Sequence, residues 1–139
     1  MSDLAFFDTN VIVYAHDQNA PDKRAKALSL LRAHRDQDTI VISLQVLQEY
    51  FVTIVRKFAI PSPEAQRNVE ILAYAKVVRF TEADILTAIR LHQSAQISFW
   101  DAMIVHAARV GGASVLFTED LQHGATIAGV RIENPFREL

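Results

Sequence analysis

The chain has 139 residues, of which 50% are hydrophobic and 22% charged, values typical of one globular domain with its own core. It contains no cysteine, which excludes disulfide bonds, thiolate metal sites and a cysteine nucleophile. The 14 basic and 16 acidic residues give a formal net charge of −2, which argues against a protein that holds nucleic acid by phosphate contacts alone. Because neither a long apolar stretch nor a basic leader is visible, we expect a cytoplasmic protein without a membrane span.

Short apolar runs alternate along the chain with longer segments of helical periodicity. We expect strands at 4–7, 40–42, 77–80, 115–117 and 130–132. Helices are predicted at 11–15, 21–35, from Ser43 to a stop at Pro61, 62–75, after Thr81, and 98–110 before Gly111-Gly112. This alternation favours a three-layer α/β/α domain with a central parallel sheet of four to five strands. Without visible repeats or linkers, we expect residues 1–139 to form a single domain.

Acidic residues follow two of the predicted strands. Asp8 comes directly after the first strand, and Glu119-Asp120 lie just past the fourth. Turn and cap chemistry explains either position alone, because Asp favours both. Ligands of open α/β sheets, however, bind at the carboxyl ends of the strands. Two acidic positions at one edge therefore leave a structural role and a functional site about equally favoured.

Asp101 lies on a predicted helix that is apolar nearly all round. At 100° per residue it falls between Ile104, Val105 and Ala108 on one helix face. A carboxylate that faces the core is costly unless it is paired, hydrogen-bonded or bound to a metal. The alternative is a capping box, because Ser98 stands three residues earlier and could satisfy the acid locally.

Glu49 has no comparable signal in its own helix. It lies opposite the apolar stripe formed by Leu47, Tyr50, Phe51 and Ile54, so periodicity alone indicates a solvated surface acid. Only its position, in the second turn of a helix that follows a strand end, would let it reach the same sheet edge.

Four short motifs occur in order along the chain: Asp8-Thr9-Asn10, Glu49 at the end of 43–49, Ser98-Phe99-Trp100-Asp101-Ala102 and Thr118-Glu119-Asp120-Leu121. In this order and spacing, and within the predicted alternation, they resemble the PIN-domain nucleases. The resemblance covers essentially the whole chain and is closest to the small single-domain ribonuclease toxins of the virulence-associated protein C (VapC) type. Each motif alone is weak, whereas four in register are specific.

The resemblance implies a PIN-like fold and a metal-dependent endoribonuclease, the toxin of a toxin–antitoxin pair, which hydrolyses RNA phosphodiester bonds with a metal-activated water. It implies a homodimer and an antitoxin that covers the site. Mg²⁺ or Mn²⁺ would be bound by Asp8, Glu49, Asp101 and Asp120, with Thr9, Asn10, Thr118 and Glu119 as accessory residues. Physical chemistry agrees, because clustered carboxylates repel one another without a compensating cation, and Mg²⁺ prefers oxygen ligands.

Two other functions start from an acid at a strand end. A phosphatase of the haloacid-dehalogenase type normally has a second Asp two residues after the first, where this chain has Asn10. A non-catalytic regulatory or binding module, similar to phospho-receiver domains, pairs adjacent acids after the first strand and uses a Lys after a late strand. Neither of those features is present in the sequence.

Three further features bear on contact with RNA. Basic residues crowd the segment 21–35, and we interpret them as a solvated helix face first and an RNA or partner surface second: Lys23, Arg24, Lys26, Arg32 and Arg35. If four acids hold two divalent cations, −2 plus +4 gives a net charge of +2, so the net charge does not exclude an RNA substrate. Trp100 and the Phe residues are expected in the core rather than as platforms for bases.

Overall fold

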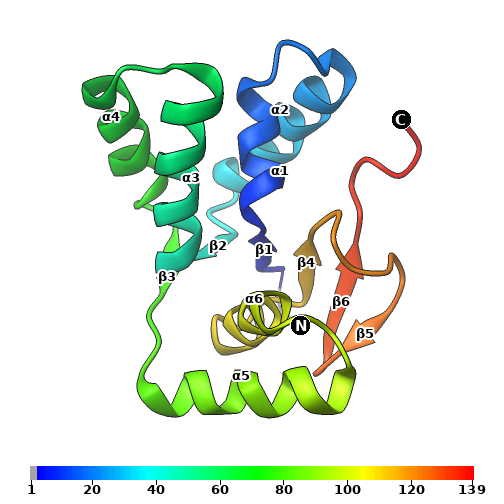
Figure 1. Ribbon diagram of the computed structural model, residues 1–139. Helices are drawn as coiled ribbons and strands as arrows, with labels where there is room; N and C mark the ends of the chain where they lie inside the picture. Colours follow the sequence, from blue (N-terminus) through cyan, green and yellow to red (C-terminus); the bar gives the residue numbers. More distant parts are fainter. Residues whose placement is uncertain (1–2) are drawn as a thin grey trace.

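The computed structural model describes residues 3–139, in which strands and helices alternate along the chain (Figure 1). The strands are β1 (Ala5–Phe7), β2 (Ile40–Ser43), β3 (Lys76–Val78), β4 (Val115–Phe117), β5 (Thr126–Ile127) and β6 (Val130–Glu133). The helices are α1 (Thr9–Val13), the short 3-10 helix η1 (Tyr14–His16), α2 (Pro21–Asp36), α3 (Leu44–Phe58), α4 (Ser62–Leu72), α5 (Glu82–Ala95) and α6 (Phe99–Val110). Within residues 3–139, no helix combines the length and the apolar character that crossing a bilayer demands.

The strands form one sheet in the order β3-β2-β1-β4-β6-β5. All neighbouring strands are parallel except β5 and β6, which confirms the predicted parallel core of the sheet. Strand β1 is central, and its three residues Ala5–Phe7 are fully buried. A strand that is covered on both faces needs apolar side chains in both directions, which is why this run shows no alternation with polar residues.

The sheet differs from the expectation in two places. The described residues form six strands rather than four to five, because Thr126–Ile127 pairs with β6 through a two-residue turn. The turn residues Ala128 and Gly129 both have positive φ, 51° and 81°, as in the turns that suit tight hairpins. The strand expected at 77–80 lies instead at Lys76–Val78, and the Phe80 ring packs 5.2 Å from that of His106.

Helices cover both faces of the sheet and complete the three layers. On one face the His34 ring of α2 packs 5.5 Å from the Phe7 ring and 5.6 Å from the Phe117 ring. On the other face, α6 ends at Gly111, where a Cβ atom would lie only 2.6 Å from Cγ1 of Val41. Figure 1 shows α5 running along the outer side of α6. The tight contact at Gly111 explains why a glycine ends α6 against the sheet.

The carboxyl ends of β1 and β4 meet at one edge of the sheet. The N–H group of Asp8 donates to the Phe117 carbonyl at 3.0 Å, so the ladder between these strands extends to Asp8. Beside them, β2 passes directly into α3, whose first turn is capped by the Ser43 hydroxyl, which accepts from the N–H of Val46 at 3.3 Å. Residues that follow three neighbouring strands are therefore brought to the same edge.

Candidate active site

A pocket of about 140 Å³ lies at this edge, between α1, α3, the start of α6 and the loop after β4. All four acids predicted for the site line it. No Lys, Arg or His from residues 3–139 lines it, so its acids have no cationic neighbour within the pocket. The complete lining is Asp8, Thr9, Asn10, Gln45, Glu49, Thr53, Trp100, Asp101, Ile104 and Asp120.

Asp8 is the buried acid of the pocket, with 8% of its surface exposed. Its Oδ1 accepts from the N–H of Thr9 at 2.8 Å, and its Oδ2 accepts from the Thr118 hydroxyl at 2.8 Å. Burial, together with the smaller effect of the charges of Asp120 and Glu49, raises the pKa of Asp8 from 3.8 to about 6, against the lowering effect of these two bonds. The ionised form is thus destabilised, and a bound cation would offset that cost.

Glu49 reaches the pocket from the second turn of α3. Its Oε1 accepts from the Thr9 hydroxyl at 3.0 Å and from Nε2 of Gln45 at 3.2 Å. Thr9 therefore contacts two of the acids, Asp8 through its N–H group and Glu49 through its hydroxyl. This contact between α1 and α3 holds a largely exposed side chain at the sheet edge.

Asp101 lies at the start of α6, where a capping box would need two hydrogen bonds between Ser98 and Asp101. At α5 both bonds of such a box are present, because Thr81 caps the N–H of Asp84 and the Asp84 carboxylate accepts from the N–H of Thr81. Between Ser98 and Asp101, both in the described part of the chain, only the bond from the Asp101 N–H to Ser98 Oγ is formed, at 3.0 Å. Ser98 caps the helix, and the Asp101 carboxylate lines the pocket instead.

Asp120 is held at the pocket by the loop after β4. Its N–H donates to Thr118 Oγ1 at 3.1 Å, and the same hydroxyl donates to Asp8, so buried Thr118 links the two acids. Partial burial raises the pKa of Asp120, and the charges of Asp101 and Glu119 raise it further. The acids of the pocket thus affect one another's ionisation.

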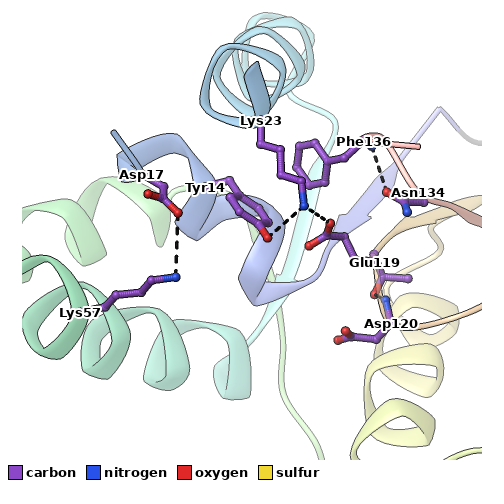
Figure 2. A network of polar contacts seen from close by, with 9 residues as sticks. Tyr14, Asp17, Lys23, Lys57, Glu119, Asp120, Asn134 and Phe136 are labelled. Carbon is purple, nitrogen blue, oxygen red and sulfur yellow. Dashed lines mark hydrogen bonds and ion pairs between the residues drawn. The ribbon is translucent and has the colours of Figure 1, made fainter. Parts of the chain in front are cut away.

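Glu119 lies outside the pocket, although it precedes Asp120 in the chain. Its Oε2 is 2.7 Å from Nζ of Lys23, which also donates to the Tyr14 hydroxyl at 3.2 Å. The Lys23 ammonium lies 4.7 Å from the centre of the Tyr14 ring. Figure 2 shows the Glu119 side chain directed to Lys23 and the Asp120 side chain directed away from it. Lys23, interpreted from sequence as part of a solvated face, is therefore in a partly buried ion pair.

The donor set of the pocket fits a hard divalent cation. Four carboxylates with two threonine hydroxyls nearby supply the oxygen ligands that Mg²⁺ and Mn²⁺ prefer. As the side chains of residues 3–139 stand, no group of three or more His, Asp or Glu is arranged to hold a metal ion. The Glu49 carboxylate is hydrogen-bonded to Thr9 and Gln45, and it would exchange those bonds for a cation.

Sequence reasoning missed several residues of the pocket. Trp100 was expected in the core, and this was wrong, because 63% of its surface is exposed while it lines the pocket. Gln45 and Thr53 also line it, together with Glu49 between them. The spacing of four residues places these three on one face of α3, so this polar face was a signal in the sequence once Glu49 was placed.

Comparisons with known proteins agree with this arrangement. The profile of the PIN domain family matches residues 5–126. The chain therefore belongs to the PIN domain family. A comparison of the sequence with curated proteins gives no match.

Solved structures of similar fold include several toxin–antitoxin proteins. A toxin–antitoxin complex from Klebsiella pneumoniae has a chain that aligns with a TM-score of 0.66 and 24% identity, over 94% of this chain and 97% of that chain. A chain of VapBC2 from Rickettsia felis, bound to a DNA fragment from its promoter, aligns with a TM-score of 0.67 and 22% identity. The alignment covers 94% of this chain and 98% of that chain. VapC20 from Mycobacterium tuberculosis, a toxin that cleaves the sarcin-ricin loop, aligns with a TM-score of 0.65 and 16% identity. The alignment covers 84% of this chain and 89% of that chain. At these identities the likeness establishes the fold.

Proposed function

We propose that this PIN-domain protein is a metal-dependent endoribonuclease and the toxin of a toxin–antitoxin pair. The observation that carries the proposal is the pocket in which four carboxylates from separate parts of the chain meet without a cationic side chain. Such a site is unfavourable for the empty protein and suited to a cation, as the raised pKa values of Asp8 and Asp120 indicate. The fold shared with toxin–antitoxin proteins supports the biological role.

In this proposal Asp8, Glu49, Asp101 and Asp120 hold Mg²⁺ or Mn²⁺. A bound ion would supply activation of water and compensation of charge for hydrolysis of the RNA phosphodiester bond. Two threonines act as positioning residues. Thr118 fixes Asp8 and the backbone of Asp120, and Thr9 fixes Asp8 and Glu49.

The two alternatives fit the pocket less well. A phosphatase of the haloacid-dehalogenase type would place a second Asp where Asn10 lines the pocket. A receiver-like module would place a lysine beside the acids, but Lys23, the lysine bound to an acid of this loop, pairs with Glu119 outside the pocket. The nuclease uses every acid of the pocket and requires neither missing residue.

A second surface of the molecule supports the proposal that a protein partner binds. A pocket of about 430 Å³ lies between α2 and α4, with a largely apolar lining that includes Ile71 and Tyr74, 67% and 88% exposed. Its lining also includes two arginines and one acid, Arg32, Arg35 and Asp38. An antitoxin segment that combines apolar and acidic side chains would complement this surface. Association with such an antitoxin, and assembly as a homodimer, are parts of the same proposal.

The test is cleavage of structured RNAs by the purified chain in EDTA, Mg²⁺ and Mn²⁺. We expect cleavage only with a divalent ion, and loss of cleavage in Asp8→Asn. The matched control is Asp22→Asn, which makes the same chemical change at an exposed acid of α2. Equal cleavage in EDTA, or equal activity of the two variants with Mn²⁺, would overturn the proposal.

A further inference from the structure

Trp100 is an exposed tryptophan at the mouth of an acidic pocket. It is the second residue of α6, and 63% of its surface is exposed. Its ring lies 5.0 Å from that of Phe99 at an interplanar angle of 66°, an edge-to-face contact that supports the indole. Of the residues in 3–139 that line the pocket, Trp100 alone is aromatic. Covering such an exposed apolar ring with a ligand removes apolar surface from water, which favours binding of that ligand.

The chemistry of the pocket indicates what that ligand is. Its side chains are acids and neutral polar groups apart from Trp100 and Ile104, and the chain as a whole carries a net charge of −2. Phosphate contacts to side chains in the pocket therefore contribute little attraction to an RNA strand. Stacking of a base on an aromatic ring does not depend on opposite charges, and it strengthens binding by about fivefold to a hundredfold per base.

We propose that Trp100 is a stacking platform for an unpaired RNA base next to the phosphodiester bond that is cut; this inference rests on the proposed nuclease function. In RNA a single sugar separates each base from its backbone phosphate. When the phosphate lies in the pocket, the base of the same nucleotide therefore lies within reach of Trp100 at the pocket mouth. Only unpaired bases expose a face for such a contact. The platform therefore selects single-stranded segments and loops.

The chain has one tryptophan, so its indole fluorescence reports on this position alone. We would titrate full-length Asp8→Asn, in which cleavage is suppressed, with a short single-stranded RNA and with the same RNA annealed to its complement. The single strand is expected to quench the fluorescence saturably and the duplex several-fold less. Binding of the single strand, measured by anisotropy of a labelled RNA, without any change in tryptophan fluorescence would overturn the inference.

Kinetics of the wild-type background give an independent measurement. Trp100→Ala is expected to raise KM for a single-stranded substrate about tenfold with kcat little changed, and Trp100→Phe to retain most of the affinity. Leu86→Ala, which truncates an exposed apolar side chain of α5, is the control and should leave KM unchanged. Equal KM values for the Ala and Phe variants would contradict a stacking role.

A second copy of the chain is the competing occupant of this surface. If a dimer covers Trp100, the indole is protected from quenching by iodide before RNA is added, and Trp100→Ala changes the molecular mass of the protein in solution. These two results would overturn the proposed role of Trp100 in stacking. Accessibility to iodide without RNA, followed by protection on adding RNA, is the expected result. If the wild type cleaves no RNA with Mn²⁺, the nuclease proposal fails in an assay separate from the fluorescence titration.

Discussion

Glu119 and Asp120 are adjacent acids with opposite surroundings. Glu119 is paired with Lys23 at 2.7 Å, in a cluster that includes the Tyr14 hydroxyl and ring (Figure 2). Asp120 lies with Asp8, Glu49 and Asp101 in a pocket that no basic side chain of residues 3–139 lines. The chain thus neutralises one acid with its own lysine and leaves the next acid among carboxylates.

These two acids show which charges serve the fold and which serve a site. The Lys23–Glu119 ion pair is complete within the protein. In the pocket, by contrast, the pKa values of Asp8 and Asp120 are raised, because burial and the charges of neighbouring acids disfavour their ionised forms. Groups kept in that state are characteristic of functional sites. Substitutions of the pocket acids and of the Lys23–Glu119 pair should therefore affect activity and stability in different ways.

The largest effect is expected for Asp101→Asn. The substitution keeps the shape of the side chain and the N–H bond to Ser98, and removes one negative charge. Cleavage should slow about a thousandfold, equivalent to roughly 4 kcal/mol of transition-state stabilisation. The metal-free protein should be at least as stable as the wild type, because Asp101 raises the pKa of Asp120. Single-turnover cleavage and urea unfolding measure the two effects. A variant that is active and less stable than the wild type would show that Asp101 has no catalytic role.

A pH effect of intermediate size is expected at Asp8. Since its pKa is about 6 when folded and 3.8 ordinarily, the folded state keeps a proton between these values that the unfolded state has lost. Stability in EDTA therefore falls as the pH rises through this window, by about 3 kcal/mol in total. Unfolding in urea at about pH 4 and about pH 7 should show this loss in the wild type and not in Asp8→Asn. Equal losses in the two proteins would contradict the unfavourable burial of Asp8.

The smallest effect is expected for the Lys23–Glu119 pair, whose side chains are 34% and 23% exposed. Lys23→Met should reduce the free energy of unfolding by about 1 kcal/mol, through loss of the ion pair and of the contact with the Tyr14 ring. Lys26→Met, at an exposed lysine of the same helix, should change it by less than about 0.5 kcal/mol. Removing Glu119 as well, in Lys23→Met/Glu119→Gln, should recover part of the loss. Independent effects at the two positions would mean that the pair contributes nothing to stability.

Much of the fold followed from local signals. Short apolar runs marked the parallel strands because β1 and its neighbours are covered on both faces, and Gly111 marked the end of α6. The hairpin of β5 and β6 was missed because its turn is Ala128-Gly129, which lacks the Asn-Gly or Asp-Gly signature of such turns.

The site was predictable only in part from the residues themselves. Asp8 and Asp120 follow strand ends, which marked them as candidates. Glu49 was assigned only through the resemblance to a family, because helical periodicity describes the faces of α3 and not the contact of Glu49 with Thr9. Nothing local separates Glu119 from Asp120, since the lysine that distinguishes them lies 96 residues away in the chain. Trp100 was misplaced because an aromatic residue on a largely apolar helix favours the core, whereas 63% of its surface is exposed at the pocket.

The melting temperature in EDTA and in excess Mn²⁺ tests most directly whether the pocket is built for a divalent cation. A cation that binds only the folded state at about 100 times its dissociation constant adds about 2.7 kcal/mol, which for a domain of this size raises Tm by roughly 8 °C. We expect this increase in the wild type and in Asp22→Asn, and a much smaller one in Asp101→Asn. A wild-type protein that melts at the same temperature in EDTA and in Mn²⁺ would contradict a cation site formed by these four acids.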